Sequence, residues 1–141
     1  MELASFGWEV TGIDHLPDAI ARAETLASRY SLNSKFIRGD VVTDNLPDEG
    51  FDLVCMFFFL HRETLERCVR SLEAGGLLML ETFSEVNRAH FGKPSLKRFV
   101  LGESEILRLT PGLAVIHHSE EWRESGKHTV RYVGRKSANG A

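Results

Sequence analysis

The sequence contains very little cysteine: Cys55 and Cys68 are the only two among 141 residues. Cys55 lies in an apolar run and Cys68 on an apolar helix face, so both are predicted to be small core residues. This usage argues against a disulfide framework and against a metal site. It favours a cytoplasmic location, because disulfides are characteristic of oxidising compartments.

Long hydrophobic runs and a strong net charge are also missing. The longest apolar stretch covers only residues 53–60, whereas a membrane-spanning helix needs about 20 apolar residues. The first residues have no secretory pattern. The net charge is −3, so no broad basic surface argues for nucleic acid. We therefore expect neither a membrane nor a nucleic acid as partner.

Strand and helix patterns alternate along the chain. Ile20, Ala23, Ala27 and Tyr30 recur with helical spacing after Pro17, which predicts an amphipathic helix. The continuous apolar run at residues 51–60 is typical of a strand covered on both faces. The expected order is helix 1–6, strand 8–13, helix 17–30, strand 35–40, loop 41–50, strand 51–60, helix 62–76 stopped by Gly75 and Gly76, strand 77–83, an irregular polar segment 84–102, helix 103–109, and strands 113–124 and 128–136.

This order predicts an α/β fold with a doubly wound sheet and a C-terminal antiparallel hairpin. We expect one domain over residues 1–136 and a frayed tail over residues 137–141. In such sheets the ligand lies beyond the carboxyl ends of the strands. The residues predicted at those ends are Asp14, Asp40, residues 57–61, Glu81 and Thr82.

Two acids at neighbouring strand ends suggest a nucleoside site. Asp14 can accept hydrogen bonds from both hydroxyls of a ribose, or it can cap the following helix. Asp40 can accept from the amino group of an adenine with Val41 packed on the base, or it can be an ordinary turn residue. Together the two acids match the two polar ends of adenosine better than either does alone.

The segment from Phe57 to His61 has two readings as well. Its aromatic rings can line a ligand pocket or fill a core, and Phe58 is expected to face away from Phe57 and Phe59. His61 is either an acid or base on the substrate side or a cap for the next helix.

Two other groups are interpreted as surface features. His117 and His118 are adjacent on a strand and face opposite ways, so they are not expected to chelate one ion. The basic segment at residues 93–98 is interpreted as a solvated loop rather than an anion site.

Four segments follow one another along the chain: GWEVTGIDHLPDAIARAETLA, FIRGDVVTDNLP, FDLVCMFFFLHRE and LEAGGLLMLETF. In this order they resemble class I S-adenosylmethionine-dependent methyltransferases. The segment FGKPSLKRFVLGESEILRL and the ending HTVRYVGRK are most similar to the small bacterial tellurite-resistance group. The resemblance covers nearly all of residues 2–136.

The resemblance implies S-adenosylmethionine as cofactor and a small-molecule methyl acceptor. Asp14 and His15 would bind the ribose end, and Asp40 and Val41 would bracket the adenine. Met56, Phe57 and Phe58 would lie along the methionine part. His61 is the candidate catalytic acid or base.

One part of the family pattern is not found. None of the 12 glycines forms a GxGxG-like cluster, and no strand precedes residues 8–13. The family's first strand normally lies between the strands expected here at residues 8–13 and 51–60. We therefore expect a methyltransferase-like domain that is truncated at its N-terminus, with impaired catalysis. The two flanking strands would pair directly, or the chain would self-associate through the exposed edges. The alternatives are a non-catalytic remnant or dimerising module, and a fragment of an NAD-dependent oxidoreductase.

Overall fold

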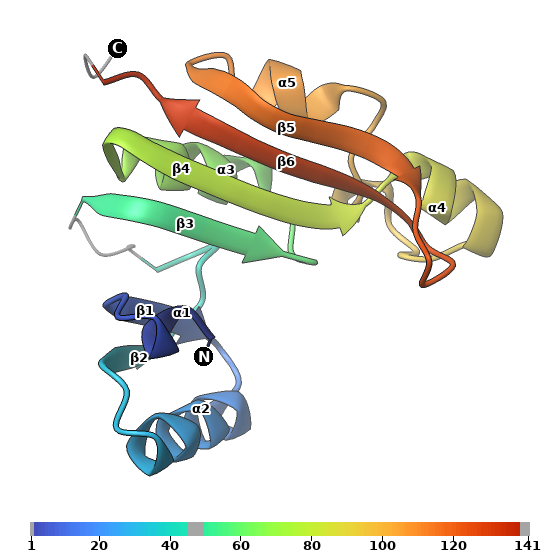
Figure 1. Cartoon of the computed structure of the whole chain (residues 1–141). Coiled ribbons are helices and arrows are strands. Elements are labelled where there is room, and N and C mark those ends of the chain that lie inside the picture. The colour runs from blue at the N-terminus through green and yellow to red at the C-terminus, as the bar shows by residue number, and fades with distance from the viewer. Residues whose placement is uncertain (1, 45–49, 139–141) are drawn as a thin grey trace. The chain divides into compact units, whose positions relative to one another are not determined.

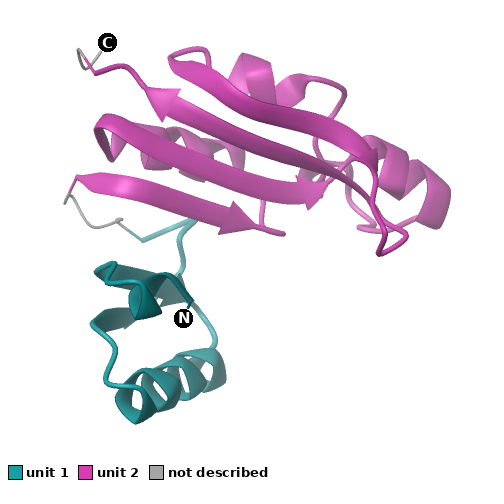
Figure 2. Ribbon diagram, viewed as in Figure 1, with its two compact units in different colours: residues 1–46 teal, residues 47–141 magenta. Residues whose placement is uncertain are grey.

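The computed structural model describes residues 2–44 and 50–138. The chain divides into two compact units, residues 1–46 and 47–141 (Figures 1 and 2). The described strands form a two-stranded sheet in the first unit and a four-stranded sheet in the second. The α/β class and the terminal antiparallel hairpin are thus confirmed. The single domain over residues 1–136 stays a prediction, and residues 139–141 of the predicted tail lie outside the described residues.

The first unit combines two parallel strands with two helices. Helix α1 (Glu2–Ser5) is followed by Gly7 at φ +92°, a left-handed conformation that glycine adopts without strain. Strand β1 (Val10–Asp14) pairs in parallel with β2 (Ser34–Arg38). Helix α2 (Pro17–Arg29) connects them and has Pro17 and Asp18 in its first turn, as predicted. Few side chains of this unit are buried, and Phe6 is 76% exposed.

The sheet of the second unit has the order β3-β4-β6-β5. Strand β3 (Phe51–Phe57) is parallel to β4 (Leu72–Phe83), and β6 (His128–Lys136) is antiparallel to both β4 and β5 (Leu113–Trp122). Alternate residues of β4 and β6 are buried, among them Leu78, Leu80, Val130 and Tyr132, each at most 1% exposed. One face of this sheet therefore carries the main core of the unit.

The helices of the second unit are short. They are α3 (Arg62–Arg70), α4 (Glu85–Phe91), the 3₁₀ helix η1 (Lys97–Phe99) and α5 (Glu105–Leu109). Leu65 of α3 and Ile106 of α5 are at most 1% exposed and add to the core. No helix within residues 2–44 and 50–138 has the length and apolarity needed to cross a membrane.

Strand β3 is less covered than its sequence predicts. It is an end strand of the four-stranded sheet, and Met56 is its only buried residue. The apolar run had predicted cover on both faces. An end strand has a neighbour along only one edge, so its side chains are packed by fewer partners.

The glycine pair has a different role from the predicted one. Helix α3 ends at Arg70 with Ser71 as cap, and Gly75 and Gly76 lie inside β4. The pairing shifts from Phe51 opposite Leu72 to Leu53 opposite Leu77, which is a bulge. A Cβ on Gly76 would lie 2.9 Å from the Phe51 carbonyl oxygen, so the close approach of the backbones requires glycine.

Helix α4 lies in the segment predicted to be irregular. Ser84 is its N-cap and accepts from the Asn87 amide across 3.2 Å. Gly92 closes the helix in the left-handed conformation. A serine cap and a glycine stop are the usual end signals of a helix.

Candidate functional site

The two predicted nucleoside-binding acids lie at neighbouring strand ends of the first unit. Asp14 is the last residue of β1 and is in register with Arg38, the last residue of β2. Asp40 follows shortly after, and the intervening Gly39 amide donates to the Asp14 carbonyl oxygen across 3.0 Å. Because the strands are parallel, both acids occupy the carboxyl edge, where sheets of this type bind ligands.

Each acid uses one carboxylate oxygen in a local turn. Asp14 Oδ1 accepts from the Leu16 amide at 2.8 Å, and Asp40 Oδ1 accepts from the Val42 amide at 2.9 Å. Such Asx turns are common where a strand ends. The side chain of Asp14 is 45% exposed, and within the described residues its Oδ2 accepts no hydrogen bond. One oxygen of Asp14 therefore stays open to a ligand while the other fixes the side chain.

His15 and Val41 flank these acids. His15 Nδ1 lies 3.9 Å from Asp14 Oδ1, too far for a hydrogen bond, and its side chain is 74% exposed. Val41 is half-buried in the turn that follows β2. The rest of the predicted loop, residues 45–49, lies outside the described residues.

In the second unit, the end of β3 carries the aromatic segment. Met56 is buried, whereas Phe57 is 52% and Phe58 54% exposed. Phe58 has φ +54°, an uncommon conformation for a bulky residue. Its amide donates to the Glu81 carbonyl oxygen at 2.7 Å, and its ring lies 5.1 Å from that of Phe83.

The strand ends at Phe57, so the aromatic segment continues beyond it. Phe57, Phe58 and Phe59 are all exposed, so none of the three rings fills the core. The strained φ at Phe58 turns the chain out of the strand, so the period of two no longer applies.

His61 is the N-cap of α3. Its Nδ1 lies 2.8 Å from Thr64 Oγ1 and accepts from the Thr64 amide at 3.3 Å. The capping alternative is therefore realised. An acid or base role stays a prediction and would have to use Nε2.

A hollow of about 450 Å³ in the second unit is organised by an ion pair. Arg62 Nε and Nη2 donate to the two carboxylate oxygens of Glu105 at 2.6 and 2.9 Å. Arg62 also donates to the carbonyl oxygens of Arg98 and Val100 at 2.9 Å. The hydrogen bond from Arg62 holds the pKa of Glu105 below its ordinary value, against the opposing effect of burial. This pair fixes the segment before α5 to the start of α3.

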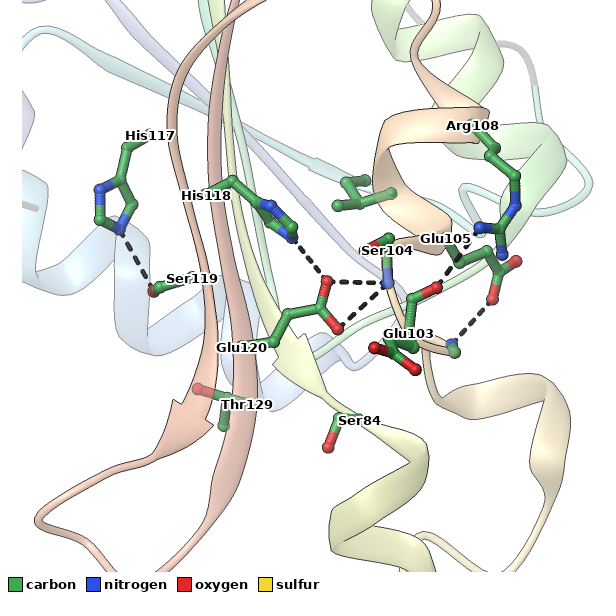
Figure 3. A network of polar contacts seen from close by, with 12 residues as sticks. Ser84, Glu103, Ser104, Glu105, Arg108, His117, His118, Ser119, Glu120 and Thr129 are labelled. Carbon is green, nitrogen blue, oxygen red and sulfur yellow. Dashed lines mark hydrogen bonds and ion pairs between the residues drawn. The ribbon is translucent and has the colours of Figure 1, made fainter.

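A second hollow of about 330 Å³ lies beyond the carboxyl end of β4, and we call it the β4 hollow. His118 Nε2 is 2.5 Å from Glu120 Oε2, and both Glu120 oxygens accept from the Ser104 amide at 3.0 and 3.2 Å (Figure 3). Deeper in, Ser84 Oγ is 2.6 Å from His128 Nδ1. Its lining residues are Ser84, Glu85, Val86, Glu103, Ser104, His118, Ser119, Glu120 and His128.

Sequence reasoning did not single out this cluster. His117 and His118 were set aside as surface residues, and they do turn to different partners, Ser119 and Glu120. The usable signal was the spacing of His118 and Glu120, because residues two apart on a strand share a face. The hydrogen bond from the Ser104 amide to Glu120 joins two separate segments of the chain, and no sequence pattern predicts it.

The comparisons with known proteins concern one family. Residues 1–76, more than half of the chain, match a family model described as "Methyltransferase domain". No curated protein is similar enough to count as a match.

The solved structures with the same fold are related only distantly in sequence. TehB from Haemophilus influenzae has a TM-score of 0.75 at 19% identity, over 96% of this chain and 52% of that chain. The N-methyltransferase NodS from Bradyrhizobium japonicum WM9 has a TM-score of 0.69 at 21% identity, over 90% of this chain and 72% of that chain. NodS was also solved in complex with S-adenosyl-L-homocysteine. A SAM-dependent methyltransferase from Methanosarcina mazei has a TM-score of 0.68 at 22% identity. The match covers 96% of this chain and 85% of that chain. The chain thus spans about half the length of the TehB chain.

Proposed function

Because the chain belongs to the methyltransferase domain family, we propose that it transfers the methyl group of S-adenosylmethionine to a small-molecule acceptor. The observation that carries this proposal is the placement of Asp14 and Asp40 at adjacent strand ends, inside the segment that the family model covers. The cofactor is the one named for the SAM-dependent structural neighbour.

The first unit supplies the nucleoside contacts. The open Oδ2 of Asp14 would accept from the ribose hydroxyls, and charge assistance strengthens such bonds. His15 would lie beside the ribose. Asp40 would accept from the adenine amino group, with Val41 against the base. The fit is supported by an Asp14 side chain that is held by Leu16 yet 45% exposed.

Met56, Phe57 and Phe58 would lie along the methionine part, as the family resemblance implies. His61 would move a proton only through Nε2, since Nδ1 is engaged with Thr64. The bound cofactor supplies an electrophilic methyl group, and the protein aligns the acceptor and excludes water.

One feature of the sequence suggests that this activity is weak. It contains no GxGxG-like cluster to hold the methionine end. We therefore expect the 141-residue chain alone to bind S-adenosylhomocysteine weakly and to turn over slowly.

Asp14→Asn tests the cofactor assignment. The asparagine keeps the acceptor for the Leu16 amide but loses the charge. Hydrogen bonds to a charged group contribute about 1.5–3 kcal/mol, so we expect about 10- to 100-fold weaker binding of S-adenosylhomocysteine in calorimetry. Asp18→Asn, on an exposed acid of the same unit, should bind like the wild type. Unchanged binding by Asp14→Asn, or stabilisation by NAD alone, would contradict the proposal and favour the oxidoreductase alternative.

A self-associating module is the second candidate function. It is favoured by the end position of β3 in its sheet and by Phe57, Phe58 and Phe59, which are 52%, 54% and 38% exposed. End strands of this kind pair readily with a second copy. A sedimentation series showing monomers at every concentration would exclude it.

A further inference from the structure

His118 is held as one half of a hydrogen-bonded pair. Its ring nitrogen Nε2 contacts Glu120 Oε2 at 2.5 Å, and the Ser104 amide fixes Glu120 from the other side (Figure 3). An ionised carboxylate only accepts hydrogen bonds, so Nε2 carries the proton. In the neutral ring, the lone pair therefore lies on Nδ1, which accepts no hydrogen bond within the described residues. This arrangement leaves one basic nitrogen on a side chain that lines the β4 hollow.

The β4 hollow is suited to a small ligand. Its volume of about 330 Å³ falls at the lower end of ligand pockets, which range from about 300 to 1,000 Å³. It begins directly after the last residue of β4, at Ser84. The carboxyl ends of strands are where sheets of this type bind their ligands.

The charges around the β4 hollow disfavour an anion. Three of its lining residues are glutamates: Glu85 at the start of α4, Glu103 before α5, and Glu120 on β5. Glu85 is paired with Arg88 at 3.0 Å, but no lysine or arginine lines the hollow. His118 and His128 are the remaining titratable groups in the lining. A ligand with no charge or a positive charge is therefore favoured.

We propose that the β4 hollow takes a small amine as the methyl acceptor, and that His118, positioned by Glu120, removes the proton from its nitrogen. This inference rests on the methyl transfer proposed above. An amine is cationic in neutral solution, which suits the carboxylates, and it must lose a proton before it can attack. Both requirements are met by groups that line the same hollow.

The proton and electron balance is complete without a further reactant. The ammonium R–NH₃⁺ gives a proton to His118 Nδ1 and becomes R–NH₂, and the imidazole becomes imidazolium. The nitrogen lone pair then forms a bond to the methyl carbon, and the pair of the broken carbon–sulfur bond stays on sulfur. The imidazolium returns its proton to solvent, so each turnover releases one proton and forms a methylammonium and a thioether.

Three probes of matched shape test the acceptor class. 2-Phenylethylamine, 2-phenylethanol and phenylacetate differ mainly in the charge of the terminal group. The measurement is the NMR signal of the His118 ring in the full chain, titrated with each probe, with and without S-adenosylhomocysteine. We expect the amine to shift this signal and the carboxylate to leave it unchanged at the same concentration.

Variants separate the role of His118 from a structural one. His118→Phe should weaken amine binding about ten-fold, because a hydrogen bond to a charged group is lost. His117→Gln, on the exposed neighbour, should bind the amine like the wild type. Glu120→Gln should also weaken amine binding, since the hollow loses one of its negative charges and His118 loses its charged hydrogen-bond partner. Glu121→Gln, on an exposed acid of the same strand, should bind the amine like the wild type.

The outcomes separate this inference from the proposed function. Binding of S-adenosylhomocysteine with no response of His118 to the amine, or an equal response to phenylacetate, overturns the amine site and leaves methyl transfer standing. A response of His118 to the amine without any binding of S-adenosylhomocysteine supports the amine site and overturns methyl transfer. If neither ligand binds, both proposals are wrong.

Discussion

Arg62 and Glu105 illustrate how much a single side-chain pair can do in the second unit. The guanidinium of Arg62 binds both carboxylate oxygens of Glu105 and two carbonyl oxygens of residues 98 and 100. Glu105 also accepts from the Gly102 amide at 3.0 Å. The pair therefore satisfies backbone carbonyl groups of residues 98 and 100 in the segment between α4 and α5.

Glu105→Gln should reveal this pair as a pH-dependent contribution to stability. The pKa of Glu105 is lowered, chiefly by its hydrogen bond to Arg62. Its contribution is therefore present above the pKa of the unfolded chain and is lost as the pH falls through the lower pKa of the folded state. We expect Glu105→Gln to reduce the free energy of unfolding by about 1–3 kcal/mol at pH 7, with the difference shrinking below about pH 4. Urea unfolding at several pH values measures this.

Glu66 provides the matched control for that experiment. It forms an i,i+4 pair with Arg70 at 3.7 Å, and both side chains are at least 67% exposed. Exposed pairs of this kind contribute about 0.5 kcal/mol or less. Equal effects of Glu66→Gln and Glu105→Gln at pH 7 would show that the Arg62 contacts contribute nothing beyond surface charge.

At the residue scale, the sequence predicted positions better than contacts. Strand ends could be located from the apolar pattern, so Asp14 and Asp40 were placed correctly at one edge. Their Asx turns depend on side-chain angles that no pattern encodes. The pairing of Glu120 with the Ser104 amide brings together segments 16 residues apart, and only the folded chain specifies it.

At the scale of elements, helix α3 is fixed at both ends by side chains from other positions. His61 accepts from the Thr64 amide at its start. Lys136 of β6 donates to the carbonyl oxygens of Val69, Arg70 and Leu72 near its end, at 3.3, 3.3 and 2.8 Å. A cation there also interacts favourably with the helix dipole. These contacts supplement the few intrahelical hydrogen bonds of a helix of only 9 residues.

Substitutions of His61 distinguish a cap from a proton carrier. Asparagine is a good N-cap, so His61→Asn should keep the stability of the wild type, whereas His61→Ala should lose about 1 kcal/mol. If His61 only caps α3, the rate of methyl transfer by His61→Asn should also be unchanged. Thermal unfolding and a methyl-transfer assay on both variants measure this. A loss of activity in His61→Asn at unchanged stability would instead assign Nε2 a role in the reaction.

Element boundaries were predicted best where apolar spacing and end signals agreed. The stripe of Leu65 and Cys68 located α3 correctly, but the glycine pair was taken as its stop. A bulge and a helix end use glycine for the same reason, which is tolerance of unusual or crowded backbone. Helix α4 was missed because its residues are largely polar, even though Ser84 and Gly92 mark its ends.

At the scale of the whole molecule, the two units differ in how much core they bury. In the first unit, Ala4 and Ala27 are the buried apolar residues among those described. The second unit has the larger set, including Leu65, Leu78 and Ile106. The apolar pattern predicts which side chains favour burial. It does not predict how much of each helix or strand is covered by other elements. Among the described strands, the densest burial is found on one face of β4 and β6.

Hydrogen exchange with S-adenosylhomocysteine tests whether one ligand engages residues of both units. Ligand binding stabilises the bound state by RT ln(1 + [L]/Kd), about 2.7 kcal/mol at a hundred-fold excess over Kd. Amides that exchange through opening of the bound structure should then slow by roughly a hundred-fold. The amides to follow are Leu16 and Gly39, which bond to Asp14, and Phe58, which bonds to Glu81. The Arg123 amide in the terminal hairpin, bonded to Lys127, serves as reference.

The pattern of slowed amides decides between the assignments. Slowing of Leu16, Gly39 and Phe58, with Arg123 unchanged, is expected if Asp14, Asp40 and the end of β3 all contact the ligand. Slowing of Leu16 and Gly39 alone would keep the nucleoside contacts and exclude Met56, Phe57 and Phe58 from the site. If all four amides slow equally, the ligand stabilises the chain globally and the assignment of contacts must come from variants. If none slows at a concentration that saturates the wild type in calorimetry, Asp14 and Asp40 do not form the nucleoside site, because a ligand held at those strand ends has to restrain the turns beside them.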